Sequence, residues 1–195
     1  MSAERSTPSP DIRVITEAAV LSALAHPFRS RLLDALKVDG PSTASSLSRR
    51  TGQAVGSVSH HLKVLADVGL VEEAPELARD RRERWWRLVS QGLRWSQSDI
   101  ADDPVAVEAG AAAESMNFRS QVERTRAWFD NREAAVEWAD AAFATQHWLK
   151  LTPDELHELG EEIVALLMTW TDRPTDDNQD REPVLVYARG FPSQP

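Results

Sequence analysis

The stretch 57–71 constrains the fold of this chain most, because it joins a helical apolar pattern, a helix stop and the start of a strand. Val58, Leu62 and Leu65 recur at i, i+4 and i+7, so they share one face of a helix that can be buried in a small core. Gly69 then ends the helix. The polar outer face of this predicted helix consists of Ser57, Ser59, His60 and Lys63.

The segments before this helix predict two more helices and a tight turn. Residues 43–52 are expected to form a short helix with Thr43 as its N-cap, and residues 51–53 a turn of the length that joins two crossed helices. Upstream, Pro27 suits the first turn of a helix over residues 28–36, whose apolar stripe can pack against the pair. These elements predict a helix-turn-helix.

Two short runs of strand type follow, at residues 70–74 and 84–89, and the loop between them is rich in arginine. A helix-turn-helix followed by such a hairpin is a winged helix. A helix with short polar side chains can enter the DNA major groove, about 12 Å wide, while nearby arginines meet phosphates. We therefore expect the helix over residues 54–68 and the wing at 79–84 to read DNA. The candidate DNA-binding residues are Thr43, Gln53, Ser57, Ser59, His60, Lys63, Arg79, Arg81, Arg82 and Arg84.

Two short motifs carry a resemblance to a known family. One reads Ser59-His60-His61-Leu62-Lys63-x-Leu65 and ends in Gly69-Leu70-Val71; the other, Ala25-His26-Pro27-x-Arg29, opens the preceding helix. With these motifs in order, residues 14–88 resemble the ArsR family of winged-helix repressors. Within the first motif, His61 is expected to pack rather than to contact bases, which makes His60 the better contact candidate.

The resemblance implies a homodimer that sits on a roughly palindromic operator in double-stranded DNA. It places residues 53–63 in the major groove and the wing near the minor groove or the phosphates. One alternative stays open: a ligand-sensing or protein-interaction module that uses the winged-helix fold without sequence-specific DNA binding.

The net charge of -9 is unevenly distributed along the chain. Residues 11–94 hold 13 Lys and Arg against 10 Asp and Glu, a net +3, whereas residues 95–195 hold 8 against 20, a net -12. The basic residues thus lie where DNA is expected. Because neutralising phosphates dominates affinity, we expect binding that weakens steeply with salt, and an acidic half that faces away from the duplex.

The chain contains no cysteine, so the thiolate metal sites of some relatives cannot exist here. Four possible oxygen and nitrogen ligands do lie within two predicted helical turns: Asp154, His157, Glu158 and Glu161. The paired motif of zinc-sensing relatives is absent, and charged residues at helical spacing usually form a solvated face. We expect no metal and no cofactor, although a metal at His157 stays open.

The acidic half is predicted to be organised rather than a tail. Residues 107–129 read as one long helix, of a length that suits dimerisation, with one apolar face formed by Ala111, Phe118, Val122 and Phe129. A second helix begins at Thr152, where Pro153 and Glu155 complete a capping box. A polar loop over residues 172–182 follows it.

After that loop, residues 184–188 have strand composition and are expected to pair with residues 146–151. The predicted fold is therefore mainly α: a winged helix-turn-helix with a hairpin wing, then an α-helical dimerisation and effector region that contains a short strand-helix-strand unit. We expect a disordered tail over residues 1–13, a DNA-binding domain over 14–95 and an acidic domain over 105–195.

Four of the seven tryptophans lie in the predicted acidic domain over residues 105–195, and two interpretations of them stay open. Large rings fill cores and dimer interfaces. They also wall pockets for apolar or cationic small-molecule effectors. The candidate effector pocket consists of Trp128, Trp138, Phe143, Trp148 and Trp170.

Other classes of protein lack support in the sequence. There is no phosphate-cradling glycine loop, nucleophile elbow or dinucleotide fingerprint, so we expect no enzyme. No long apolar run and no signal peptide are present, so we expect a cytoplasmic protein without membrane partners.

Overall fold

The computed structural model describes residues 12–80, 83–171, 173–174 and 180–194, and it is mainly helical. The chain divides into two compact units, one up to Val136 and one from Glu137 to the C-terminus. No helix among the described residues has the length and apolarity needed to cross a bilayer.

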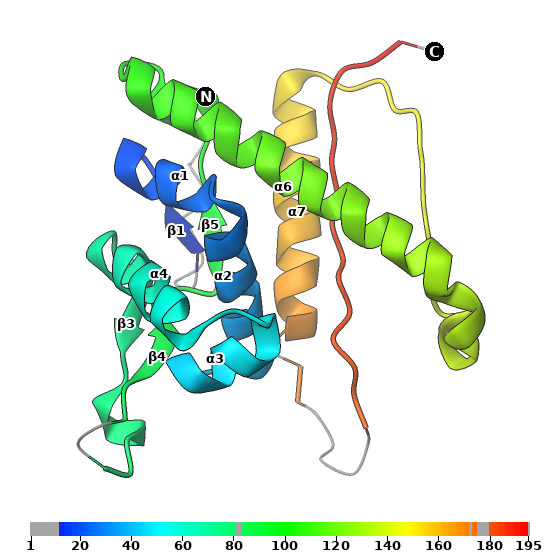
Figure 1. Ribbon diagram of the computed structural model, residues 1–195. Coiled ribbons are helices and arrows are strands. Elements are labelled where there is room, and N and C mark those ends of the chain that lie inside the picture. The colour runs from blue at the N-terminus through cyan, green and yellow to red at the C-terminus, as the bar shows by residue number, and fades with distance from the viewer. Residues whose placement is uncertain (1–11, 81–82, 172, 175–179, 195) are drawn as a thin grey trace. The chain divides into compact units, whose positions relative to one another are not determined.

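The helices of the first unit begin and end where the local sequence directs (Figure 1). Thr43 and Asp103 accept hydrogen bonds from backbone N–H groups in the first turns of α3 and α6, and prolines open α2 and α6. Gly40 and Gly52 end α2 and α3 with φ of 72° and 71°, where a side chain would be strained. The helices are α1 (Ala18–Leu24), α2 (Pro27–Asp39), α3 (Ala44–Thr51), α4 (Val55–Asp67), α5 (Gln97–Ile100) and α6 (Pro104–Asn131).

Two small sheets complete this unit. Strands β2 (Ser42–Thr43), β4 (Trp85–Leu88) and β3 (Val71–Glu73) form an antiparallel sheet in that order, and Val71 pairs with Leu88. The predicted hairpin wing is thus confirmed, with a 3₁₀ turn, η1 (Pro75–Leu77), inside it. Strand β1 (Ile12–Val14) runs parallel to β5 (Gly92–Arg94). Both strands are only three residues long, so no alternation of buried and exposed side chains can be followed along them.

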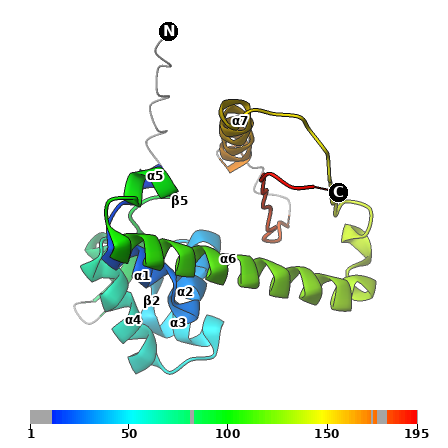
Figure 2. The ribbon, with the colours of Figure 1, turned by 90° about the horizontal axis from the view of Figure 1, so that it is seen from above.

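Every helix of the first unit from α1 to α6 contributes residues to its core, whereas the 3₁₀ turn η1 of the wing has no buried residue. Leu21, Leu32 and Leu62 have no exposed surface, and the first half of α6 adds Ala106 and Ala113. Small side chains on that face let α6 pack closely against α1, and a side chain at Gly110 would start 2.9 Å from Ile100 Cδ1. Figure 2 shows α6 passing over α1.

This packing moves two of the expected domain boundaries. The expected division between residues 95 and 105 does not coincide with the division into compact units, because α6 joins the first core and that division falls after Val136. The expected tail over residues 1–13 is too long, since Ile12 and Arg13 belong to β1. The rest of that tail, residues 1–11, lies outside the described residues.

Helix α6 has an apolar face on each side. Its buried residues include Ala109 and Met116, whereas Phe118 and Phe129 are 53% and 61% exposed. At 100° per residue, the predicted face of Ala111, Phe118, Val122 and Phe129 lies opposite the buried face. The sequence pattern therefore identified the outer stripe of α6, and the inner stripe consists of smaller residues.

The second unit contains one long helix, α7 (Pro153–Thr171), after short 3₁₀ turns at η2 (Arg132–Ala134) and η3 (Val136–Trp138). The predicted capping box is present: Glu155 N donates to Thr152 Oγ1 over 3.3 Å, and Thr152 N donates to Glu155 Oε2 over 2.7 Å. These bonds to Thr152 lower the pKa of the Glu155 carboxyl. No described residue of α7 is buried.

The predicted strand-helix-strand unit does not form. Residues 146–151 and 184–188 are both extended chain without a sheet ladder. The segment that carries the second run lies along α7 instead, where a side chain at Gly190 would start 2.8 Å from Leu156 Cδ1. Strand composition measures fit to a half-buried sheet, and two isolated strands without such a surface are marginal. Much of the expected loop over 172–182 lies outside the described residues.

Candidate nucleic-acid interface

Helix α4 divides cleanly into a buried and an exposed side. Val58, Leu62 and Leu65 have no exposed surface. On the other side, Ser59, His60 and Lys63 are exposed, and Ser57 is half-buried. The hydrophobic face fixes the helix in the core, so the three exposed side chains present hydroxyl, imidazole and ammonium groups to one side.

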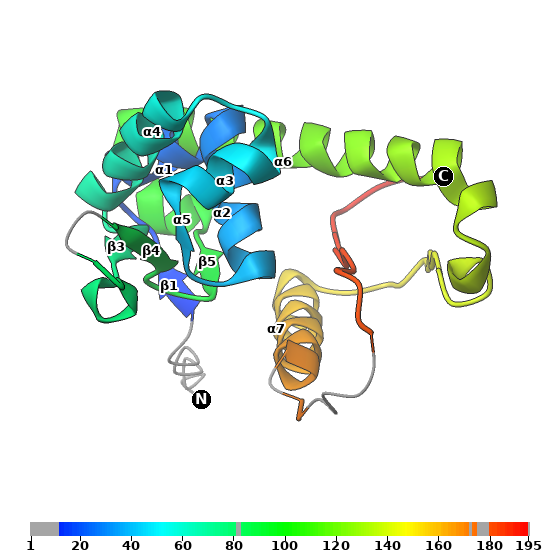
Figure 3. The same ribbon diagram turned by 60° about the horizontal axis from the view of Figure 1, so that its bottom comes forward.

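Helix α3 and its turn stand next to α4 (Figure 3). The predicted N-cap is confirmed: Ser46 N donates to Thr43 Oγ1 over 3.2 Å, so this half-buried hydroxyl is already engaged by the helix. Gln53, after the left-handed Gly52, is exposed, and its carbonyl accepts a 2.5 Å hydrogen bond from Ser48 Oγ. The side chain of Gln53 is thus better placed for an outside partner than that of Thr43.

The C-terminal end of α4 is held by an arginine that the sequence patterns did not single out. Arg13 Nη1 donates to Gly69 O over 2.7 Å and to Val68 O over 3.4 Å. Cations near a helix C-terminus satisfy its free carbonyls and its negative dipole end. Arg13 thereby ties β1 to the end of α4. The available signal for this role in the sequence was the position of Arg13, a basic residue within an apolar run before the first helix.

The start of α2 brings a second histidine against α4. His26 Nδ1 accepts hydrogen bonds from Phe28 N over 3.2 Å and from Arg29 N over 3.4 Å, which makes His26 the N-cap of α2. Its ring centroid lies 4.8 Å from that of His61, and the His61 ring also meets Phe28 at 5.0 Å and His60 at 5.3 Å. His61 is half-buried and turned inward, as expected from the sequence.

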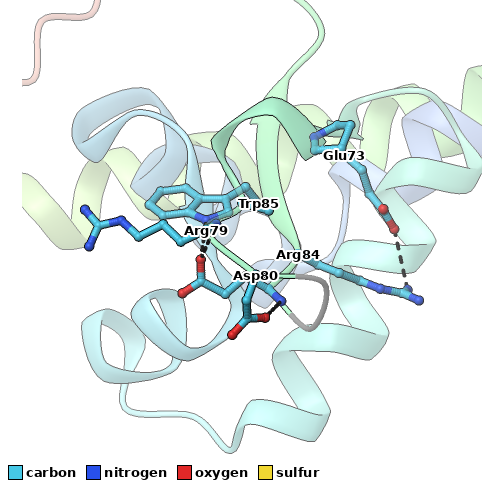
Figure 4. Close-up of a pocket in the computed structure, with 8 residues that line it drawn as sticks. Glu73, Arg79, Asp80, Arg84 and Trp85 are labelled. Atoms are coloured by element: carbon cyan, nitrogen blue, oxygen red, sulfur yellow. Dashed lines mark hydrogen bonds and ion pairs between the residues drawn. The ribbon is translucent and has the colours of Figure 1, made fainter.

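The wing carries arginines and carboxylates together (Figure 4). Arg84 Nη1 lies 3.5 Å from Glu73 Oε1, and Glu83 Oε2 accepts from Arg79 N over 3.1 Å and from Trp85 Nε1 over 3.3 Å. These contacts line a hollow of about 490 Å³. In Figure 4 the Arg79 guanidinium points away from the labelled carboxylates. Arg79 is therefore the more available of the two described wing arginines.

Two other predicted wing contacts, Arg81 and Arg82, lie outside the described residues. Further along the hairpin, Arg87 is held by Glu72 and Glu76, whose carboxylates raise its pKa. The carboxylates of the hairpin thus compensate part of its positive charge.

The five residues of the candidate effector pocket come from both units of the chain. Trp128 belongs to the first unit and the other four to the second. Phe143, Trp148 and Trp170 are 74%, 60% and 63% exposed. A hollow beside Trp170 is lined by Thr169, Arg173 and Pro174, with the Arg173 guanidinium 5.0 Å from the Trp170 ring centroid. Within the part of the chain that the structure describes, no three His, Asp or Glu side chains are arranged to hold a metal ion.

Comparison with known proteins agrees with this domain. Residues 24–74 match a family described as a helix-turn-helix domain. The chain is similar to the crystal structure of a possible transcriptional regulator for arsenical resistance, with 26% identity over 56% of this chain and 94% of that chain and a TM-score of 0.32.

It is also similar to Lactococcus lactis ZitR, solved as an apo double mutant and as the wild type in complex with DNA. The identities are 16% and 15%, the matches cover 80% and 76% of this chain and 81% and 74% of those chains, and the TM-scores are 0.28 and 0.26. No curated protein matches the chain. The helix-turn-helix predicted from the sequence is confirmed: residues 24–74 are a helix-turn-helix domain, and the β3–β4 hairpin makes it a winged one.

Proposed function

We propose that this chain is a dimeric, DNA-binding transcriptional repressor that reads a palindromic operator with α4. The observation that carries the proposal is the two-sided build of α4 within the helix-turn-helix domain. Its apolar side is fully buried, and Ser59, His60 and Lys63 are exposed on the other. Side chains of this kind reach base edges and phosphates from a helix in the major groove.

The remaining predicted contacts are assigned as positioning contacts to the DNA backbone. Gln53 lies in the turn before α4, and the exposed Arg79 lies in the wing. Contacts of this type fix the register of a protein on the duplex and add affinity without reading sequence. Arg81, Arg82 and Arg84 are proposed for the same role.

The proposed dimer uses the outer stripe of α6. Phe118 and Phe129, both more than half exposed, lie on the side of the helix opposite the residues that it buries. A helix of this length offers such a stripe to the same stripe of a second copy, which gives a two-fold interface matched to a palindrome.

A small-molecule effector is proposed for the second unit. Phe143, Trp148 and Trp170 are exposed, and the Arg173 guanidinium already lies near the face of the Trp170 ring. An aromatic face that accepts a guanidinium also accepts other organic cations, and the acidic surroundings favour the same charge. We thus propose a regulatory rather than a catalytic role, in which a ligand of this unit releases DNA.

Selection of binding sites from random duplexes, followed by footprinting, tests the proposal. Replacing Ser59 and His60 together by Ala is expected to lower the preference for the operator over other duplexes by about 10- to 100-fold. Each good base contact discriminates against the wrong base by about 1–3 kcal/mol. Arg79→Ala is expected to weaken binding to all duplexes and to lower the salt slope by about 1. Lys37→Ala, an exposed change on α2 with the same loss of charge, is the control. Absence of binding to any duplex at low salt would overturn the proposal.

A further inference from the structure

The N-terminus of α2 depends on a titratable acceptor. N-caps are usually Ser, Thr, Asp or Asn, whose oxygens accept at any ordinary pH. Here His26 Nδ1 accepts from Phe28 N and Arg29 N, so this nitrogen must carry no proton. A proton on Nδ1 would face two N–H donors and would end the cap.

The same ring packs against the DNA-reading helix. His26 and His61 stand with ring centroids 4.8 Å apart and planes tilted by 44°. His61 Nδ1 is buried and has no hydrogen-bond partner in the described part of the chain. The other charged and titratable groups that face the pair are Arg29, from α2, and His60, from α4 itself. Helix α1 contributes only the carbonyls of Ala23 and Ser22, which hold Arg29 in place.

The surroundings of the pair disfavour positive charge. Burial lowers the pKa of both rings from the ordinary 6.5, and Arg29 lowers both further. The folded chain therefore prefers neutral rings. Their contribution to stability is complete above the unfolded value of 6.5 and is lost as the pH falls through the folded-state values.

We propose that His26 is a positioning residue for α4, and that protonation of the His26–His61 pair releases the N-cap of α2, shifts α4 and lowers DNA affinity in acid. The inference rests on the proposed DNA-binding function. The two rings link the start of α2 to the centre of α4, so a change at the cap reaches Ser59 and Lys63 through one contact. If only the neutral form binds, the apparent Kd rises about tenfold for each pH unit below the folded-state pKa.

The test compares variants on one selected operator duplex at constant salt, between about pH 8 and about pH 5.5. His26→Asn retains a capping oxygen and removes the titration. His61→Phe retains a ring and removes the second charge. His147→Gln, an exposed histidine change in the second unit, is the matched control. We expect the Kd of the wild type and of His147→Gln to rise about three- to tenfold in acid, and the Kd of His26→Asn to rise less than about twofold.

Circular dichroism at each pH shows whether the fold persists, and NMR titration of the histidine Cε1–H signals in the free wild type reports the same event without DNA. Signals of His26 and His61 that move together below pH 6.5 support the inference. Absence of binding at pH 8 overturns the proposed function itself. Binding at pH 8 with His26→Asn and His61→Phe as acid-sensitive as the wild type overturns the inference alone. Should His26→Asn not fold, His61→Phe and the NMR titration decide.

Discussion

Helices α4 and α7 carry similar apolar stripes, yet α4 is buried and α7 is not. In α4, Val58, Leu62 and Leu65 have no exposed surface. In α7 no residue is buried, and Leu166 and Trp170 are 59% and 63% exposed. Helix α7 even starts with a capping box, whereas Ala54 at the start of α4 offers no side-chain cap. The difference shows that periodicity predicts a helix and its apolar face, whereas burial depends on what the rest of the chain provides.

The contrast fits two different tasks. For the base reading proposed above, α4 must present its polar side chains from a fixed position, and it is held by its buried stripe and by Arg13 at its end. A helix whose apolar face is only partly covered, such as α7, is available to a second copy or to a ligand. The first unit thus fits the proposed DNA-reading domain, whose helix α4 is fixed in a core. The second unit offers exposed apolar surface to the proposed effector or to a second copy.

The largest expected effect comes from truncating one leucine in each helix. Leu62→Ala removes a fully buried side chain and is expected to lower the free energy of unfolding of the first unit by about 3 kcal/mol. Leu166→Ala, on the exposed side of α7, is expected to change it by less than about 0.5 kcal/mol. Urea unfolding of the full chain measures both. Equal losses would mean that α7 is covered in solution.

Helix α6 offers two neighbouring alanines, one buried and one exposed. Ala113 is 1% exposed against α1, whereas its neighbour Ala112 is exposed. Ala113→Leu is expected to cost about 2 kcal/mol by overpacking the core, and Ala112→Leu to be nearly neutral. Thermal and urea unfolding measure the pair. If Ala113→Leu were as stable as the wild type, α6 would not belong to the core of the first unit.

A smaller effect is expected where Arg13 holds the end of α4. Arg13→Ala leaves the carbonyls of Gly69 and Val68 to water, at a cost of about 1.5 kcal/mol. Arg126→Ala, an exposed change on α6, removes the same charge and is expected to be neutral. Urea midpoints compare the two variants. A loss shared by both would point to net charge rather than to the cap.

The smallest effect is expected at the start of α7. Thr152→Ala breaks the capping box and is expected to destabilise the helix by about 1 kcal/mol. Thr169→Ala removes a hydroxyl that only bonds back to Ala165 O within the helix, so its loss is expected to be neutral or slightly stabilising. Amide hydrogen exchange along α7 measures the change. Equal protection in both variants would show that packing rather than the cap holds α7.

Prediction from sequence succeeded where several local signals coincided. The end of α3 at Gly52, the cap at Thr43 and the buried stripe of α4 each follow from residues within one or two turns. It failed where elements were short or depended on distant partners. Strand β1 needs β5, which follows eighty residues later, and residues 184–188 have strand composition but no strand beside them.

The candidate interface shows the same division. Ser59, His60 and Lys63 could be placed on an exposed face from spacing alone, and His61 on the inner side. Nothing in the local pattern indicated that His61 meets the ring of His26 across two helices. The expected aromatic pocket required five side chains to converge, and the structure leaves three of them largely exposed.

The sequence by itself determined the helices of the winged helix-turn-helix and the polar face of α4, because periodicity, capping and turn chemistry act over a few residues. Only the tertiary structure decided that α6 completes the first core, that Arg13 closes the end of α4 and that α7 buries none of its residues. Those outcomes depend on contacts between segments far apart in the chain, and their free energy arises only once the segments are packed together.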